Sequence, residues 1–261
     1  MGLRPPRRTC CVAEDTVPGT GQLVLLPALL CDAELWRDQV AALEGRWRCH
    51  VADLTQGNTL ASLARSVLDQ AAPRFALAAF SFGGYVAQEI LRMAPDRVER
   101  LALVGTGFER DTPARHGERL AAVRAAQNPG RFEGITDRLL QRFVHPDRLA
   151  DRLLVERIRT MTMRVGREVF IRQSLVDRQD GTGVLQAVRC PTLVLCGMQD
   201  KLTSLESHRR MAALIPGARL RSLDRCGHMA PMEQPDAVTV ILRDWLCWPG
   251  GTPAMAAIRS D

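Results

Sequence analysis

The stretch Arg74–Met93, RFALAAFSFGGYVAQEILRM, decides the fold of this chain. Its apolar first part predicts a buried strand that ends at Phe80, and the residues after Gly83 have the spacing of a helix. Ser81 lies at the sharp turn between the two, where strained backbone geometry requires small residues two positions before and after it. Ala79 and Gly83 meet that requirement. The pattern is typical of a serine nucleophile presented at a strand-to-helix turn.

A serine hydroxyl becomes a good nucleophile only when a base takes its proton and an acid orients that base. The run Pro191–Gly197 predicts a buried strand, and Asp200 follows its end. The run Arg219–Leu223 predicts another strand, followed by the loop that contains His228. Since the carboxyl ends of parallel strands meet at one edge of a sheet, we expect Asp200 and His228 to lie beside Ser81.

Two other carboxylates compete with Asp200 for the role of the orienting acid. Asp224 directly precedes the loop of His228, and Glu233 follows it. We prefer Asp200 because it comes directly after a predicted buried strand, at the edge where sites of such folds are found.

The chain also offers backbone donors for an oxyanion. The apolar run Gln22–Leu26 predicts a buried strand that leads into a loop beginning at Pro27. The expected donors are the amide of Phe82, which follows the nucleophile, and one amide of this first loop. Leu29 is our choice, and Leu30 is the alternative.

Four segments carry a resemblance to a known family: LLPALLCDAELW, AFSFGGYVAQEILRMAPDRVERLALVGT, CPTLVLCGMQD and CGHMAPMEQPDAV. Over residues 20–247 the chain resembles small bacterial members of the α/β-hydrolase superfamily, whose chain order of Ser, Asp and His it shares. The resemblance implies a serine hydrolase with a mostly parallel sheet flanked by helices. Two positions depart from many relatives, which have His-Gly at Pro27-Ala28 and Gly at Ala79.

The strand signal disappears between Phe108 and Val188, where helical patterns cover about 118–126, 134–143, 149–163 and 167–177. We therefore expect an all-helical cap inserted into an α/β core. The expected organisation is an N-terminal segment 1–19, a core of 20–107 and 189–247, a cap of 108–188 and a flexible tail of 248–261.

Apolar side chains of the cap and the loops are candidates for an acyl-binding pocket, although Met and Phe on helices are also typical of core packing. These candidates are Leu30, Phe143, Met161, Phe170 and Met229. Arg outnumbers Asp and Glu in the cap. This excess reflects either solvated helix faces or attraction of an anionic substrate or an acidic carrier.

Composition narrows the possible partners. The chain has 261 residues, a net charge of +6 and 46% hydrophobic residues, which suits one globular α/β domain with an insertion. It has no basic helix with interleaved aromatic residues, so we expect no nucleic acid as partner. It has no signal peptide or membrane-span pattern, so we expect a cytoplasmic protein, either a monomer or a homodimer. The eight cysteines lack zinc-binding spacing and suit apolar packing, and we expect no metal or cofactor.

These observations predict hydrolysis of a carboxylic ester of a small to medium acyl substrate through an acyl-enzyme. Alternatives that use the same three residues are lactone hydrolysis, hydrolysis of acyl groups on an acidic carrier, haloperoxidase-like perhydrolysis and C–C bond hydrolysis. An alternative of a different class is a non-catalytic ligand-binding protein on the same fold.

Overall fold

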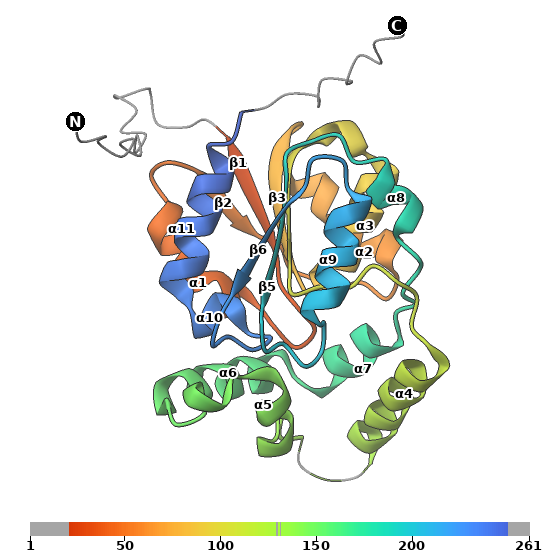
Figure 1. The fold of residues 1–261 in the computed structure, drawn as a ribbon. Coiled ribbons are helices and arrows are strands. Elements are labelled where there is room, and N and C mark those ends of the chain that lie inside the picture. The colour runs from red at the N-terminus through yellow and green to blue at the C-terminus, as the bar shows by residue number, and fades with distance from the viewer. Residues whose placement is uncertain (1–20, 129, 131, 250–261) are drawn as a thin grey trace, which may run out of the picture.

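A computed structural model describes residues 21–128, 130 and 132–249, and they form a parallel sheet with helices on both faces (Figure 1). The sheet has six strands in the order β2-β1-β3-β4-β5-β6, and every pair of neighbours is parallel. The strands are β1 Gln22–Leu26, β2 Arg48–Val51, β3 Phe75–Phe80, β4 Val98–Val104, β5 Thr192–Gly197 and β6 Arg219–Leu223. The predicted α/β class and the predicted strands on both sides of the cap are confirmed.

Alternating side chains of the buried strands build a separate core on each face of the sheet. Leu23 and Leu25 pack with Trp36 and Trp245 on the face covered by α1 and α11, whereas Val24 faces α2 and α3. The helices of these layers are α1 Arg37–Leu43, α2 Leu60–Gln70, α3 Phe82–Met93, α9 Leu205–Leu214 and α11 Pro235–Leu246. Short helices are η1 Ala33–Trp36, η2 Pro95–Arg97 and α10 Ala230–Glu233.

The described residues between β4 and β5 form helices and loops. Four helices lie at the carboxyl ends of the strands (Figure 1): α4 Pro113–Gln127, α5 Asp137–Phe143, α6 Arg152–Val165 and α7 Arg167–Leu175, with η3 Pro146–Arg148 between α5 and α6. The starts of three of them differ from the prediction by a few residues because side chains cap them. Thr112, Thr136 and Asp151 each accept a hydrogen bond from a backbone amide of the first turn.

A further helix of the insertion, α8 Thr182–Gln186, contacts the core helices α3 and α9. At the C-terminal end, Trp248 differs from the flexible tail expected from residue 248 onward. It is 7% exposed, because its indole lies against the guanidinium of Arg219 and donates a hydrogen bond to Asp244. The predicted N-terminal segment 1–19 and the tail beyond residue 249 lie outside the described residues.

Buried polar contacts join the cap to the loop between β6 and α10. The carbonyl of Phe143 accepts hydrogen bonds from the amides of His228 at 2.7 Å and Met229 at 3.2 Å. The Oε2 atom of Glu233 accepts from the amides of His145 at 2.8 Å and Gly227 at 3.0 Å. The end of α5 therefore fixes the position of the loop that contains His228.

A second set of contacts joins the cap to the loop after β1. Gln173 of α7 is fully buried. Its Oε1 atom accepts from the amide of Leu30 at 3.1 Å, and its Nε2 atom donates to the carbonyl of Leu54 at 3.0 Å. Arg157 of α6 pairs with the carboxylates of Glu34 and Asp38. The end of α5 and the helices α6 and α7 of the cap are thus tied to the core.

The start of α3 lies unusually close to the ends of β1 and β4. A Cβ atom added to Gly83 would lie 2.7 Å from the carbonyl oxygen of Pro27, and one added to Gly84 would lie 2.6 Å from the Cβ atom of Thr106. Thr106 cannot easily move away, because its hydroxyl donates to the carbonyl of Ser81 at 2.6 Å. The absence of side chains at Gly83 and Gly84 therefore lets α3 approach the sheet at Ser81.

Gly84→Ala is expected to destabilise the fold by about 1–3 kcal/mol, the usual cost of overpacking a buried contact. Gly117→Ala in α4 is the matched control, since an added Cβ there meets no atom within 4 Å. That change should stabilise the protein by roughly 0.5 kcal/mol, because alanine loses less entropy in a helix. Denaturant unfolding measures both changes, and equal stability of the two variants would contradict the close approach.

Glu233→Gln is expected to make stability less dependent on pH. Burial raises the pKa of Glu233, although hydrogen bonds from the amides of His145 and Gly227 act in the lowering direction. The folded protein therefore holds this proton more tightly than the unfolded chain, and stability falls as pH rises from the ordinary glutamate value through the raised pKa. The glutamine side chain of the variant could still accept from both amides but cannot ionise.

The measurement is urea unfolding of wild type and variant across the range from about pH 5 to pH 8. The variant should gain stability relative to wild type as pH rises. Glu206→Gln, on the exposed face of α9, serves as the control for the loss of a carboxylate. Parallel stability curves for wild type and Glu233→Gln would overturn the expectation.

Candidate active site

Ser81 has the backbone conformation expected of a serine at a tight strand-to-helix turn. Its φ is 50° and its ψ is −113°, in a region that residues other than glycine rarely adopt. Three hydrogen bonds hold it there: its amide donates to the carbonyl of Val104, and its carbonyl accepts from the amide of Gly84 and the hydroxyl of Thr106. Its hydroxyl makes no capping bond to α3.

The structure brings Ser81, His228 and Asp200 together in a continuous chain of contacts. The Nε2 atom of His228 lies 3.0 Å from the Oγ atom of Ser81, and the Nδ1 atom lies 2.7 Å from the Oδ2 atom of Asp200. The carboxylate of Asp200 is fixed in turn by the amides of Leu202 and Thr203 and by the Thr203 hydroxyl at 2.7 Å. His228 and Asp200 are both buried.

Electrostatic interactions along these contacts determine the charge of Asp200 and which nitrogen of His228 carries the proton. Burial raises the pKa of Asp200, but the charge and hydrogen bond of His228 and the hydrogen bonds of Thr203 outweigh it and bring the pKa to about 2. Asp200 is therefore ionised at neutral pH and accepts the Nδ1 proton of His228. In the neutral ring this leaves Nε2 as an acceptor that faces the Ser81 hydroxyl.

Neither rival carboxylate makes a hydrogen bond to the His228 ring. Asp224 is exposed to solvent and accepts from Gln199 and the amide of Arg225. Glu233 binds backbone amides, as described above. Of the three carboxylates considered, Asp200 is the one in contact with the imidazole.

The two backbone donors expected for an oxyanion lie beside Ser81. Leu29 and Phe82 line the same cavity as Ser81 and His228. Phe82 is the first residue of α3, where an N–H has no acceptor within the helix. The alternative donor, Leu30, has a φ of 58°, and its amide is already used by Gln173. We therefore keep the amide of Leu29 as the candidate oxyanion donor of the first loop.

Two adjoining cavities lie between the cap and the sheet. The cavity at Ser81 has a volume of about 490 Å³ and a mixed polar and apolar wall, and its neighbour has about 430 Å³ and a mainly apolar wall. Phe143, Phe170 and Met229 line both cavities, and Leu30 lines the apolar one. Met161 lines neither, because α6 turns it into the hydrophobic core, where it is completely buried.

Several polar residues near the site have no clear signal in the sequence. Thr106 and Thr203 follow strand ends and fix Ser81 and Asp200, but a threonine in a turn is too common to stand out. Gln173 and Arg178 come from the cap, far along the chain from the residues that they contact. The buried ring of His208 accepts a hydrogen bond from the amide of Thr106.

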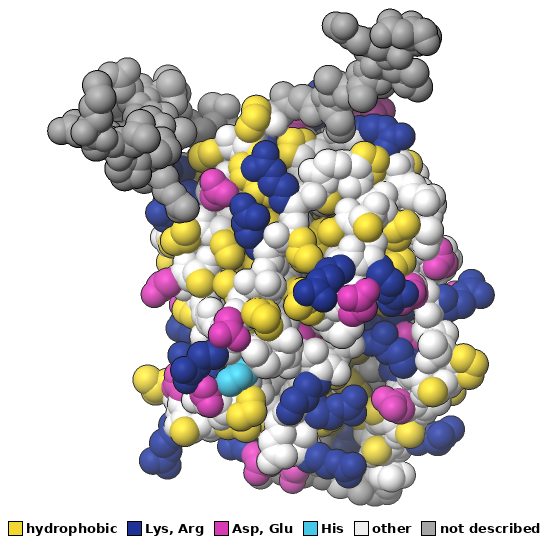
Figure 2. Space-filling model, viewed as in Figure 1, with side chains coloured by type: hydrophobic (Ala, Val, Ile, Leu, Met, Phe, Trp, Pro, Cys, Tyr) yellow, Lys and Arg dark blue, Asp and Glu magenta, His cyan; other side chains and the backbone are white. Residues whose placement is uncertain are grey.

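The Arg excess of the cap is divided between ion pairs and the cavity wall. Arg157 and Arg164 pair with acidic residues of the core near η1, and on the face shown in Figure 2 basic side chains lie next to acidic ones in several places. Arg115, Arg119, Arg142 and Arg178 instead line the Ser81 cavity, together with Asp111 and Glu118.

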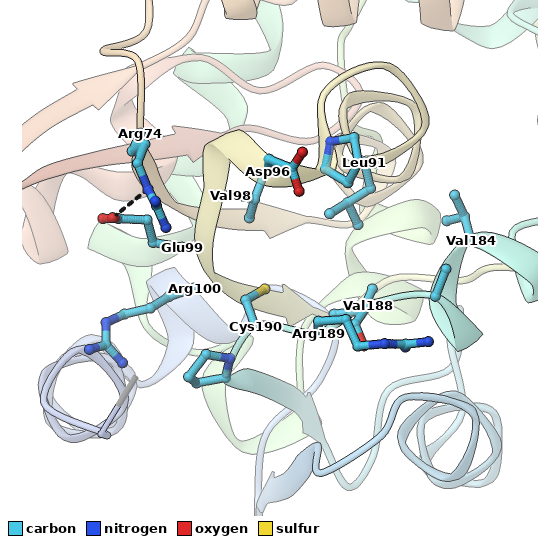
Figure 3. Close-up of a pocket in the computed structure, with 13 residues that line it drawn as sticks. Arg74, Leu91, Asp96, Val98, Glu99, Arg100, Val184, Val188, Arg189 and Cys190 are labelled. Carbon is cyan, nitrogen blue, oxygen red and sulfur yellow. Dashed lines mark hydrogen bonds and ion pairs between the residues drawn. The ribbon is translucent and has the colours of Figure 1, made fainter. Parts of the chain in front are cut away.

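A further cavity of about 860 Å³ lies at the opposite end of the sheet, near the starts of β4 and β5 (Figure 3). Its wall contains Val98, Cys190 and the ion pair between Arg74 and Glu99, whose atoms are 2.9 Å apart. None of Ser81, His228 and Asp200 lines it. It is therefore separate from the candidate active site.

The described part of the chain has no group of three or more His, Cys, Asp and Glu residues that could hold a metal ion. Within the same residues no helix is both long and apolar enough to cross a membrane. Cys31 and Cys226 are free and buried, and burial raises the pKa of both thiols, which suits packing rather than nucleophilic chemistry.

Comparison with known proteins relates the chain to one family of hydrolases. The model of the alpha/beta hydrolase family matches residues 23–240. A pimeloyl-[acyl-carrier protein] methyl ester esterase of Aromatoleum aromaticum is 26% identical over 75% of this chain and 83% of its own length. A 2-hydroxymuconate semialdehyde hydrolase of Pseudomonas putida is 28% identical over 64% of this chain and 60% of its own length.

Solved structures lead to the same result. A thermophilic esterase from Thermogutta terrifontis, solved with malate bound, superimposes with a TM-score of 0.77 and 28% identity, over 87% of this chain and 90% of its own. With the fold, the strained serine and the family match together, the chain belongs to the alpha/beta hydrolase family.

Proposed function

We propose that the protein hydrolyses a carboxylic ester through an acyl-enzyme formed on Ser81. The observation that carries this proposal is the contact chain from Ser81 through His228 to Asp200, with separations of 3.0 Å and 2.7 Å. Family membership and the esterase relatives support the same class of reaction.

In the proposed reaction, His228 takes the proton of Ser81 as its Oγ atom attacks the ester carbonyl. Asp200 orients the imidazole and stabilises its charged form. The amides of Leu29 and Phe82 donate to the oxyanion that forms on the former carbonyl oxygen. His228 gives its proton to the leaving alcohol and then activates a water molecule, which releases the acid and restores Ser81.

The adjoining apolar cavity suits a small to medium aliphatic group of the substrate. Its volume of about 430 Å³ and its wall of residues such as Leu30, Ile158 and Phe170 support this choice. Burial of each methylene would contribute about 0.8 kcal/mol to binding until the cavity is full.

The same three residues would also suit other hydrolytic reactions. Two examples are the reaction of the semialdehyde hydrolase of Pseudomonas putida and the cleavage of a carrier-bound methyl ester by the Aromatoleum protein. Lactone hydrolysis and perhydrolysis need no different constellation. A ligand-binding protein without catalysis is disfavoured by the intact contact chain and by a serine held in a strained conformation.

Ser81→Ala is expected to reduce the hydrolysis of p-nitrophenyl esters by about 10⁶-fold, because it removes the nucleophile. A fluorophosphonate probe should label wild type at Ser81 and leave the variant unlabelled. Ser66→Ala on α2 is the matched control and should keep wild-type turnover. Substantial turnover by a pure Ser81→Ala protein would sink the proposal.

Asp200→Asn is expected to lower kcat by roughly 10⁴-fold, because an amide donor facing Nδ1 favours the wrong tautomer of His228. Asp224→Asn is the matched control, since Asp224 is exposed and does not contact the ring. Steady-state kinetics on one ester compare the two. A larger loss in Asp224→Asn or Glu233→Gln than in Asp200→Asn would assign the acid to another residue.

A further inference from the structure

The wall of the Ser81 cavity contains a mostly buried group of three charged side chains. Arg119, Arg178 and Asp111 have side chains that are 14%, 12% and 10% exposed. Asp111 pairs with both arginines, and its Oδ2 atom lies 3.5 Å from the Nη1 atom of Arg178. The group therefore keeps one positive charge in excess, which is costly in a buried place unless a negative partner binds.

The two arginines are held differently. Arg119 is fixed by the protein, because its guanidinium donates to the carbonyls of Ser174 and Val176 at 2.9 and 3.0 Å. Arg178 makes no hydrogen bond to any described residue; its partner is the shared carboxylate of Asp111. Its donors therefore have capacity for a further acceptor.

Aromatic rings hold the guanidinium of Arg178 in place. The rings of Phe82 and Tyr85 lie 5.7 and 5.6 Å from its central carbon, measured to the ring centroids. Rings contact the guanidinium through its flat face and leave the N–H groups at its edge free to donate. Burial lowers the pKa of Arg178, and the charge of Arg119 acts in the same direction, so an added negative charge would be favourable here.

Ser174 supplies a second donor without an acceptor. It is 2% exposed, lines the same cavity as Ser81 and Arg178, and its hydroxyl has no hydrogen-bond partner in the described part of the chain. A buried hydroxyl without a partner costs free energy. Two donors without acceptors on one cavity wall indicate that a ligand provides the acceptors.

We propose that Arg178 and Ser174 form a carboxylate-binding subsite, so that the protein prefers esters that carry a second, free carboxylate. This inference rests on the proposed ester hydrolysis at Ser81. A carboxylate presents two oxygens in one plane and matches the fork of a guanidinium. Its negative charge would compensate the excess positive charge of the group.

The first test compares charged and neutral esters of equal chain length. The charged set contains the monomethyl esters of succinic, glutaric and adipic acids and the butanoyl esters of short hydroxy acids. The neutral set replaces each free carboxylate by a methyl group. Wild type should favour at least one charged ester over its neutral counterpart in kcat/KM, mainly through a lower KM.

Variants of Arg178 and Ser174 then test whether the proposed subsite causes the preference for the charged ester. Arg178→Gln should lower kcat/KM for the favoured charged ester by about 10- to 100-fold, the usual effect of removing a hydrogen bond to a charged group, while the neutral ester changes by less than about threefold. Arg178→Lys should restore part of the loss, because it keeps the charge but not the fork. Ser174→Ala should give a smaller loss of the same selectivity.

Arg124→Gln on α4 is the matched control, since Arg124 is exposed to solvent and lines neither of the two cavities. It should leave the preference for the charged ester unchanged. Equal losses for charged and neutral esters in Arg178→Gln would mean that Arg178 only supports Phe82 and Tyr85, and would overturn the inference. So would the absence of any preference in wild type.

A binding measurement separates this inference from the proposed function. Adipate should raise the melting temperature of Ser81→Ala protein more than hexanoate does, and the additional Arg178→Gln change should abolish the difference. If no ester is hydrolysed but this difference is found, the proposed function fails and the subsite stands. If esters are hydrolysed but adipate and hexanoate act alike, the subsite fails.

Discussion

The close approach of α3 to the sheet is the constraint on which the rest of the site depends. Gly83 and Gly84 leave room for the ends of β1 and β4, and this room lets Ser81 adopt a positive φ at the carboxyl edge of β3. β1 and β3 pair in register up to Leu26 and Ala79, so the first loop comes out beside the serine. β5 and β6 pair in the same way, which brings Asp200 and the loop of His228 to that edge.

The electrostatic character of the site depends on which arginines are already paired. Arg157 and Arg164 neutralise acids near η1 and so attach the cap without contributing free charge to the cavity. Arg178 is different, because two arginines share the carboxylate of Asp111. Ion pairs thus neutralise one part of the Arg excess of the cap. The part that the proposed carboxylate subsite would use lies in the wall of the cavity at Ser81.

The sequence predicts those features that depend on short-range patterns. The apolar runs, the small residues around Ser81 and the turn residues before His228 predict the strands and the edge at which they meet. The predicted starts of α4, α5 and α6 are wrong by a few residues, because Thr112, Thr136 and Asp151 cap these helices at other positions. The prediction of Met161 in the pocket is wrong, because the face that a helix turns to the core depends on neighbours distant in sequence.

The same limit applies to the buried polar contacts. Gln173 reaches Leu54 across 119 residues and Arg119 reaches Val176 across 57, and no local pattern encodes either pair. Polar side chains of the cap therefore give no sign in the sequence that they belong to the site. The proposed nucleophile, base and acid are accessible to prediction because each of them follows the end of a predicted strand.

The amide of Gln173 and the carboxylate of Glu233 have a consequence for how a substrate reaches Ser81. Swinging the cap away as a rigid lid would separate Gln173 from Leu30 and Glu233 from His145. Leu30, which has a positive φ, would lose the hydrogen bond that its amide donates to Gln173. Wide opening of the cap would thus release both the first loop, which contains Leu29 and Leu30, and the loop that contains His228. A substrate that reached Ser81 without such opening would pass the exposed side chains of the cavity wall, such as Arg115 and Arg142.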